Sequence, residues 1–188
     1  MSIIRRATTE DINSIVALMY AAYKPIRDLG IHFESAHPTI EKVNNNIKQN
    51  ICYVYEVDNK LIGTISLRMP WSHNPGPYNF PHIWWLATSP DYKGQGISKT
   101  LLEYIEEHVI KQNFHSPAVT LGTASNHPWL VEMYERRGYQ KFGSTNLGKG
   151  HITQYLIKVL DESLFVGEAI LKQQFTEITY KEDESIGF

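Results

Sequence analysis

The chain has 188 residues, with 18 basic and 20 acidic side chains and a formal net charge of −2 at pH 7. This near-neutral balance excludes the strongly basic surface that binds nucleic acid or anionic membranes, so neither partner is expected. The length predicts one domain with a substantial core, and the single cysteine excludes an intramolecular disulfide and a multi-cysteine metal site. No metal is therefore expected.

The N-terminal residues 1–12, MSIIRRATTEDI, lack the apolar core of a secretory signal. No run of about eighteen apolar residues, the length needed to cross a bilayer, occurs in the sequence. We therefore expect a soluble cytoplasmic protein. Cys52 lies in an alternating, strand-like stretch and is interpreted as a small core side chain rather than as a nucleophile.

The predicted elements alternate between extended and helical patterns along the chain. Helices are assigned where apolar side chains recur every three or four residues, and strands where apolar runs or alternating patterns lie between turn signals. The strands are expected at 3–6, 51–57, 60–69, 82–88, 117–123, 138–143 and 151–160, and the helices at 8–23, 37–50, 97–109 and 128–138. The order β α α β β β α β α β β predicts an α/β domain.

Two details concern the middle of the chain. Residues 70–81 hold four prolines, a glycine and three aromatic residues, a composition that suits a lid or binding loop as well as an ordered surface loop. Both interpretations stay open. In the strand that follows, regular alternation would place Trp84 and Trp85 on opposite faces of the sheet, with at least one of them in the core.

A candidate anion-binding loop is KGQG, residues 93–96, which leads directly into the helix at 97–109. The first N–H groups of a helix have no intrahelical partner, and the helix dipole adds partial positive charge there. Gly94 and Gly96 would let an anion approach the backbone closely because no Cβ intervenes. The natural ligand of such a loop is a phosphate or a pyrophosphate.

The two glycines alone do not decide the ligand. A P-loop needs four residues between its glycine and its Gly-Lys pair, which this stretch lacks, and the dinucleotide fingerprint needs a third glycine where Lys99 stands. A simple turn between a strand and a helix explains an isolated GQG at least as well. The choice depends on the wider sequence context.

That context resembles one family. The stretch 85–102, WLATSPDYKGQGISKTLL, resembles the acetyl-CoA signature of the GNAT acetyltransferase superfamily, and residues 3–23, 53–67 and 119–143 resemble its other segments. The resemblance spans roughly residues 3–160. It implies a GNAT-like α/β fold, with a central mixed, mostly antiparallel sheet of about seven strands flanked by about four helices.

The resemblance also implies a domain organisation and a cofactor site. Residues 1–160 would form the acetyltransferase domain, and residues 161–188 a C-terminal extension that packs on the domain or on a second subunit. Main-chain groups of the strand around Ala87 would pair with the pantetheine arm of acetyl-CoA, and one N–H group there would polarise the thioester carbonyl. The pyrophosphate would bind to backbone amides of the loop. The implied residues are Leu86, Ala87 and Thr88 for the arm, and Lys93, Gly94, Gln95, Gly96, Ile97 and Ser98 for the pyrophosphate.

Some positions depart from the family pattern. Lys93 stands where the family prefers arginine or glutamine, and Ser98 where it prefers glycine or alanine. Asn126, the implied contact to the cofactor arm, lies eight residues before Tyr134, one more than is usual, whereas His127 has the commoner spacing. Lysine still neutralises phosphate charge, but as a point charge without the guanidinium fork.

Two side chains are candidates for proton transfer. The resemblance implies that Tyr134 protonates the departing thiolate, although a tyrosine in this helix would also suit the core. His82 is the candidate general base, because it lies four residues before Leu86, on the same face of a regular strand, and an ordinary histidine pKa of about 6.5 suits proton acceptance near neutrality. A histidine that only closes the preceding loop is the alternative.

Together these features predict an acetyl-CoA-dependent N-acetyltransferase in which a primary amine attacks the thioester directly in a ternary complex. A non-catalytic CoA-binding sensor or assembly module, and a structural domain that self-associates through its tail, are the alternatives. The acceptor is a small-molecule amine or a protein amine, and a homodimer is left open. Glu34, His73 and Tyr78 are candidate acceptor contacts, and the acidic and aromatic residues around 31–37 and 71–80 would suit a cationic or aromatic amine.

Overall fold

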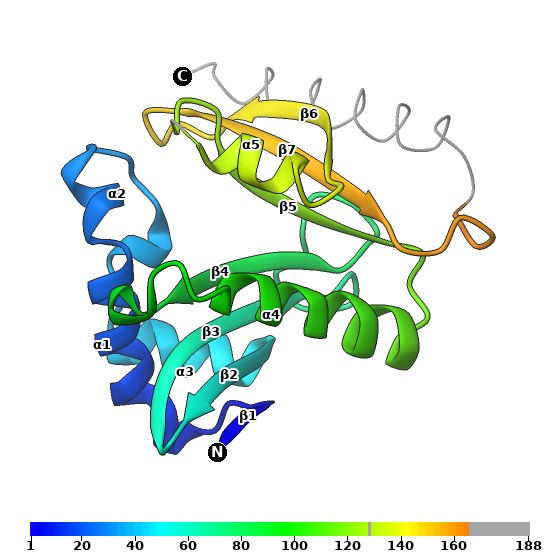
Figure 1. The fold of residues 1–188 in the computed structure, drawn as a ribbon. Coiled ribbons are helices and arrows are strands. Elements are labelled where there is room, and N and C mark those ends of the chain that lie inside the picture. The colour runs from blue at the N-terminus through cyan, green and yellow to red at the C-terminus, as the bar shows by residue number, and fades with distance from the viewer. Residues whose placement is uncertain (128, 166–188) are drawn as a thin grey trace.

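The computed structural model describes residues 1–127 and 129–165. These residues form one seven-stranded sheet with the strand order β1-β2-β3-β4-β5-β7-β6 (Figure 1). Neighbouring strands are antiparallel except β4 and β5, which are parallel, so the predicted mixed and mostly antiparallel sheet is confirmed. The strands are β1 (Ser2–Arg6), β2 (Ile51–Val57), β3 (Lys60–Arg68), β4 (His82–Thr88), β5 (Ala118–Ala124), β6 (Gln140–Asn146) and β7 (Ile152–Val159).

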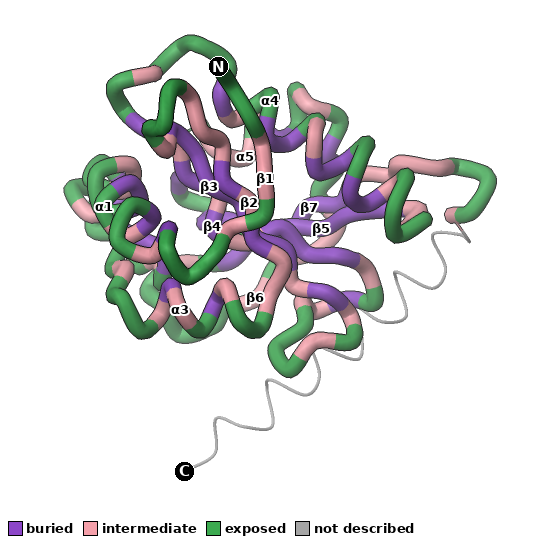
Figure 2. The backbone as a smooth tube through the Cα atoms, turned by 90° about the horizontal axis from the view of Figure 1, so that it is seen from below, coloured by how far each residue is buried: buried purple, intermediate pink, exposed green. Residues whose placement is uncertain are grey.

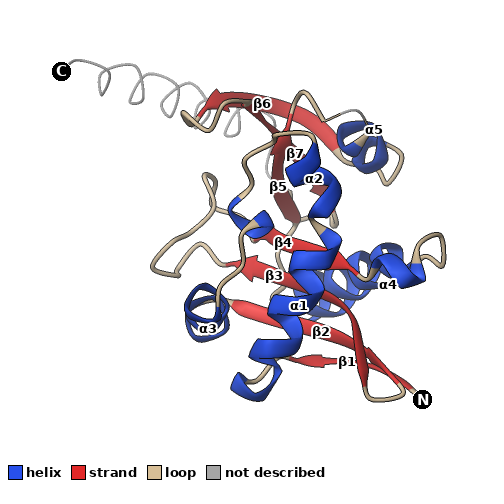
Figure 3. Ribbon diagram, turned by 90° about the vertical axis from the view of Figure 1, so that its left-hand side faces the viewer, coloured by secondary structure: helices blue, strands red, loops and turns tan. Residues whose placement is uncertain are grey.

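Helices cover both faces of the sheet, with α1 and α3 on one face and α4 on the other (Figure 3). The predicted order of elements is confirmed, and a short helix, α2, is added after α1. Beyond its last α-helical residue, α4 continues with π-helical hydrogen bonding as η4. The helices are α1 (Ile12–Ala22), α2 (Lys24–Asp28), α3 (Ile40–Gln49), α4 (Ile97–Glu103), η4 (Tyr104–Asn113) and α5 (Leu130–Glu135).

The core is divided by the sheet, and the buried positions follow the strands (Figure 2). On the α4 face, Leu101 packs with apolar side chains of β3, β4 and β5. A Cβ at Gly63 of β3 would lie 2.7 Å from Leu101 Cδ1 and 3.2 Å from Ile97 Cγ2. Glycine at this position therefore lets α4, and the loop at its N-terminus, lie close against the sheet.

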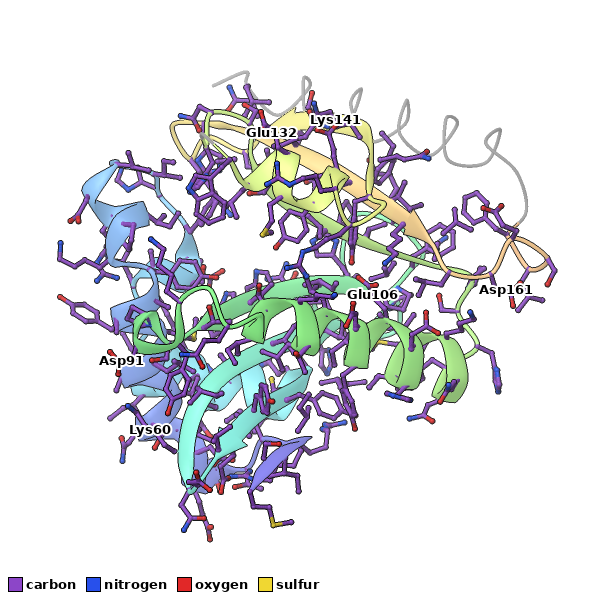
Figure 4. The ribbon with its side chains drawn as sticks, in the orientation of Figure 1. Lys60, Asp91, Glu106, Glu132, Lys141 and Asp161 are labelled. Carbon is purple, nitrogen blue, oxygen red and sulfur yellow. The ribbon has the colours of Figure 1, made fainter. Side chains whose placement is uncertain are left out.

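A buried polar cluster connects η4 to the strands on the other side of β4. The Glu106 carboxylate is 3% exposed and points from η4 toward the part of the sheet that contains β5, β6 and β7 (Figure 4). It accepts a hydrogen bond of 2.6 Å from the Tyr139 hydroxyl and forms an ion pair with Lys158 of β7. A carboxylate is tolerated at this depth because both of its oxygens have partners.

One expectation about β4 is wrong. The pairing of β3 with β4 shifts between Thr64 and Ser66, and Trp85 has φ +51°, so β4 contains a β-bulge. The extra residue turns Trp84 and Trp85 to the same face, where the two indole rings lie 4.6 Å apart and pack toward α1 and α3. Since the bulge changes the alternation, His82 and Leu86 do not share a face as expected.

The structure describes only part of the predicted division into a domain and a C-terminal extension. Strand β7 ends at Val159, close to the predicted domain boundary at residue 160, and residues 161–164 follow as a short turn. The predicted C-terminal extension, 161–188, lies outside the described residues from position 166 onward.

Candidate active site

The centre of the sheet is split. In the described residues β4 and β5 pair only at His82 with Thr120 and at Ile83 with Leu121, whereas β5 pairs with β7 along its full length. The two halves of the sheet then diverge (Figure 1). Beyond Ile83, the edge of β4 therefore faces a gap instead of a neighbouring strand.

The backbone of β4 presents hydrogen-bonding groups to this gap. Ser89 N–H donates to Ile62 O of β3 at 2.8 Å. Because the N–H groups of a strand alternate between its two edges, those of Leu86 and Thr88 point the other way, toward the gap. The Leu86 carbonyl accepts a hydrogen bond of 2.7 Å from the Tyr23 hydroxyl of α1–α2. The family resemblance implied that these main-chain groups of Leu86 and Thr88 pair with the pantetheine arm.

A cavity of about 430 Å³ occupies the gap. Its walls come from the end of α1 and the following residues, from β4 and β5, from α5, and from the turn between β6 and β7. This volume falls in the range of small-molecule sites. The lining residues are Ala22, Tyr23, Pro25, Ile26, Leu29, His32–Ser35, Arg68, Pro77, His82–Thr88, Ser98, Leu121–Thr123, His127, Trp129, Leu130, Met133, Tyr134, Leu147, Lys149, His151, Thr153 and Tyr155.

Polar atoms without partners are concentrated in this cavity. Within residues 1–127 and 129–165, eight buried side-chain nitrogen or oxygen atoms have no hydrogen-bond partner, and five of them belong to lining residues. Buried polar groups are normally satisfied, so such a group of atoms indicates a ligand site. The five atoms are Arg68 Nε, Trp85 Nε1, Thr123 Oγ1, His127 Nε2 and His151 Nδ1.

The predicted anion-binding loop has the expected backbone. Gly94 has φ +80° and Gly96, the residue before the first turn of α4, has φ +76°. A Cβ at either position would meet nothing within 4 Å, so the loop surface is open. Ser98 lines the cavity, and its hydroxyl accepts a hydrogen bond of 3.3 Å from Arg137. Besides the exposed Lys93, the loop therefore has a second cationic side chain close to it, which the sequence analysis missed.

Tyr134 lies on α5 and lines the cavity, as the proposed role requires. Its side chain is buried, and burial holds the pKa of its hydroxyl well above the ordinary value. The ring packs edge-on against Tyr139 at 5.5 Å. A hydroxyl in this setting stays protonated at neutral pH.

Of the two neighbouring candidates for the contact to the cofactor arm, Asn126 and His127, it is His127 that lines the cavity. Asn126, which the family pattern implied, is exposed and does not line the cavity, whereas His127 is buried and does. Its Nδ1 accepts hydrogen bonds from the N–H groups of Trp129 and Leu130, at 3.5 and 3.3 Å. In the neutral ring the proton is thus assigned to Nε2, which is left as a donor.

His82 also lines the cavity, but its environment differs from the expectation. The ring is 6% exposed, and its Nδ1 lies 2.9 Å from Thr120 Oγ1. Burial, together with the nearby charge of Arg68, lowers the pKa of His82 to about 3. The ring is therefore neutral at pH 7, and it binds a proton far less tightly than an ordinary histidine.

The long loop contributes little to the cavity. Tyr78 is buried against Phe142 at 4.5 Å, and neither Tyr78 nor His73 lines the cavity. Glu34 does line it and is the one carboxylate among the described lining residues. Of the three candidate acceptor contacts, Glu34 therefore lines the cavity and His73 and Tyr78 do not.

Other kinds of site receive no support from the described residues. No group of three or more histidine, cysteine, aspartate or glutamate side chains is arranged there to hold a metal ion. None of the helices described is long and apolar enough to cross a membrane.

Comparison with known proteins identifies the family. The model of the Acetyltransferase (GNAT) family matches residues 17–139, which is more than half of the chain. The chain belongs to the GNAT acetyltransferase family. Two curated relatives are both from Bacillus subtilis (strain 168). An S-(2-succino)cysteine N-acetyltransferase is 49% identical over 160 residues, covering 85% of this chain and 97% of the relative. An S-alkylcysteine N-acetyltransferase is 45% identical over 141 residues, covering 74% and 79%.

Solved structures agree on the GNAT fold. The ribosomal-protein-S18-alanine N-acetyltransferase of Escherichia coli has a TM-score of 0.66 at 13% identity, covering 89% of this chain and 97% of its own. The PaiA N-acetyltransferase of Thermoplasma acidophilum, solved with coenzyme A, has a TM-score of 0.65 at 20% identity, covering 85% and 99%. The family match and the two curated relatives show that the chain is an acetyl-CoA-dependent N-acetyltransferase of the GNAT family.

The environment of His82 predicts its titration. Because burial disfavours the imidazolium ion, the His82 ring should stay neutral down to about pH 4. The measurement is an NMR titration of the imidazole nitrogens, with the His82 signals assigned by their loss in His82→Gln. A midpoint near pH 6.5 for these signals would contradict the buried environment.

Proposed function

We propose that this GNAT enzyme acetylates the α-amino group of an S-substituted cysteine. The observation that carries the proposal is the 49% identity to an S-(2-succino)cysteine N-acetyltransferase over 97% of that relative, together with the 45% identity to an S-alkylcysteine N-acetyltransferase. Both relatives are named for the amine of a cysteine whose sulfur is substituted. The apolar and aromatic lining of the cavity suits a thioether, and its unpartnered polar atoms suit the charged groups of an amino acid.

In this proposal acetyl-CoA enters the gap between β4 and β5. The pantetheine arm pairs with Leu86, Ala87 and Thr88, where two backbone N–H groups face the gap. The pyrophosphate lies over the loop at 93–96 and the first turn of α4, where the amides and the helix dipole favour an anion. The open space over Gly94 and Gly96 supports this placement. At the arm, His127 replaces Asn126 as the polar contact.

The reaction is a direct transfer. The amine nitrogen of the acceptor forms a bond to the thioester carbonyl carbon, the carbon–sulfur bond breaks, and the thiolate of CoA leaves. Tyr134 gives its hydroxyl proton to this thiolate and takes a proton back from solvent, because burial disfavours the tyrosinate. The amine loses one proton. A β4 N–H group stabilises the charge that develops on the carbonyl oxygen. Cys52 takes no part, because burial raises the pKa of its thiol to about 11 and it does not line the cavity.

His82 is proposed as the first acceptor of the amine proton. Its Nδ1 contacts Thr120, whose hydroxyl also lies 3.4 Å from the Pro81 carbonyl. If that hydroxyl donates to Pro81, Nδ1 carries the ring proton and Nε2 is left to accept one. A ring with a pKa of about 3 does not retain the proton, so His82 acts by passing it on toward solvent.

We also propose that residues 1–160 form the acetyltransferase domain, with a C-terminal extension over 161–188, most of which falls outside the described residues. The protein is further proposed to be cytoplasmic, to be able to form a homodimer and not to bind nucleic acid. The alternative of a non-catalytic CoA-binding module finds no support in the named relatives, which are both enzymes.

The acceptor class is tested by turnover. Purified protein is incubated with acetyl-CoA and S-(2-succino)cysteine, S-ethylcysteine, alanine or spermidine, and both CoA release and the mass of the product are measured. We expect acetylation of at least one S-substituted cysteine with a kcat/KM at least about tenfold above that for alanine, because alanine cannot fill the cavity beyond the amine. Turnover of spermidine alone would refute the proposal.

The placement of the pyrophosphate is tested with Gly96→Asp. A carboxylate at this position would repel the pyrophosphate, so the Kd for acetyl-CoA should rise at least about tenfold by calorimetric titration. The matched control is Gly30→Asp, since Gly30 has a similar φ of +67° and open space but lies outside the loop. Equal affinities in the two variants would remove the loop from the site.

The role of Tyr134 is tested with Tyr134→Phe. Removing the proton donor should lower kcat by about 10²-fold or more while the KM for acetyl-CoA changes little. Tyr20→Phe, which alters a tyrosine that is 60% exposed on α1, serves as the control. A kcat within twofold of the parent enzyme would show that Tyr134 is only a packing residue.

A further inference from the structure

Arg68 is a cation without a carboxylate partner. It ends β3, its guanidinium carbon lies 3.3 Å from the ring centroid of Trp84, and its Nε is buried without a hydrogen-bond partner. The ion pairs of residues 1–127 and 129–165 do not include it. Because Arg68 also lines the cavity, a ligand that enters the cavity can reach it.

The cost of burying this charge points to an anionic ligand. Arg68 is half-buried and forms no ion pair within the described residues, and this partial burial lowers its pKa to about 10. The nearby charge of Glu34 opposes this shift only in part. With a pKa still well above neutrality, the guanidinium stays charged at pH 7. Its stacking on an indole ring holds the planar fork in one orientation, which suits a carboxylate.

Other residues that line the cavity also favour an anionic ligand. Lys149 is a second cation in the lining, against the single carboxylate of Glu34, although the chain as a whole has a net charge of −2. The turn between β6 and β7 brings His151 against Phe33, at 5.6 Å between ring centroids, and next to His32. The cavity lining therefore has two cations against one carboxylate, together with histidine N–H donors, which fits an acceptor with more than one carboxylate.

The position of Arg68 along the sheet indicates which carboxylate it would meet. Its guanidinium lies over Trp84, which precedes the bulge and lies two residues before Leu86 on β4. The amine under attack must lie at the thioester beside Leu86. The α-carboxylate of a cysteine shares a carbon with that amine and stays close to it. A carboxylate on the S-substituent lies beyond the sulfur and can extend toward Trp84.

We propose that Arg68 binds a carboxylate of the acceptor's S-substituent, and that this contact makes dicarboxylic conjugates such as S-(2-succino)cysteine better substrates than S-alkylcysteines. The inference rests on the proposed function and deepens it. In this inference Arg68 contacts the S-substituent and not the amine or the thioester, so it determines specificity. Because its charge also lowers the pKa of His82, the readout is the ratio of two substrates and not the absolute rate.

The test compares two substrates in three variants. For Arg68→Met, which keeps the aliphatic length and removes the charge, kcat/KM for S-(2-succino)cysteine should fall about 10- to 100-fold more than kcat/KM for S-ethylcysteine. Arg68→Lys should give an intermediate ratio, because it keeps a point charge but loses the fork. The matched control is Arg6→Met, since Arg6 also stacks on an aromatic ring, that of Tyr53 at 5.5 Å, but lies on β1 outside the cavity. Its substrate ratio should equal that of the parent enzyme.

The ratio of the two substrates separates the possible results. A selective loss with the succinyl substrate supports the inference, and the remaining S-ethylcysteine activity shows that the variant is folded. An equal loss with both substrates would mean that Arg68 serves the α-carboxylate or the fold, and no loss would mean that it serves neither; both results overturn the inference while the proposed function stands. If the parent enzyme acetylates neither substrate, the proposed function itself fails, and this inference fails with it.

Discussion

The early end of pairing between β4 and β5 is the constraint on which the rest of this molecule depends. Backbone N–H and C=O groups inside a protein need partners, and in a regular sheet the next strand provides them. Here the next strand turns away after Ile83, and the edge of β4 faces a cavity. The bulge at Trp85, the glycine at position 63 and the loop before α4 all arrange groups around this edge. A ligand with amide groups of its own can take the position of the missing strand.

The cavity at this edge has two differently built ends. Toward α4 the cavity reaches Ser98, next to the main-chain amides and glycines of the loop at 93–96, which suit phosphates and depend little on side-chain identity. Toward the turn between β6 and β7 it is bounded by side chains such as Arg68, Lys149 and His151. The first end therefore matches a family-wide cosubstrate, while the second is where members of the family can differ. The two curated relatives are named for S-substituted cysteine acceptors, and the acceptor proposed for this chain would bind at that second end.

Sequence reasoning worked where the signal was local. The loop at 93–96 is defined by two glycines and the start of a helix, and the hairpin of β2 and β3 by a polar turn at Asp58 and Asn59, so neither depends on distant residues. It was wrong for Trp84 and Trp85, because the bulge arises from pairing with β3. It also assigned His82 an ordinary pKa, since burial by the surrounding elements is invisible in a short motif. Arg68 was missed altogether, and the available signal was an arginine at the end of an otherwise apolar strand. The catalytic and binding roles of these residues stay predictions.

The position of the Glu106 cluster matters for the gap between β4 and β5. Lys158 pairs with Val119, one residue before Thr120, where the short pairing of β5 with β4 begins. Glu106 and its two partners thus lie at the apex of a wedge and bind its two arms to each other through directional bonds, where apolar contacts would allow sliding. These three polar side chains do not line the cavity, yet they connect η4 to the strands on one side of the split and so help to set the width available to a cosubstrate. Substitution of Glu106, Tyr139 or Lys158 would therefore change the affinity for the cosubstrate without altering the residues that line its site.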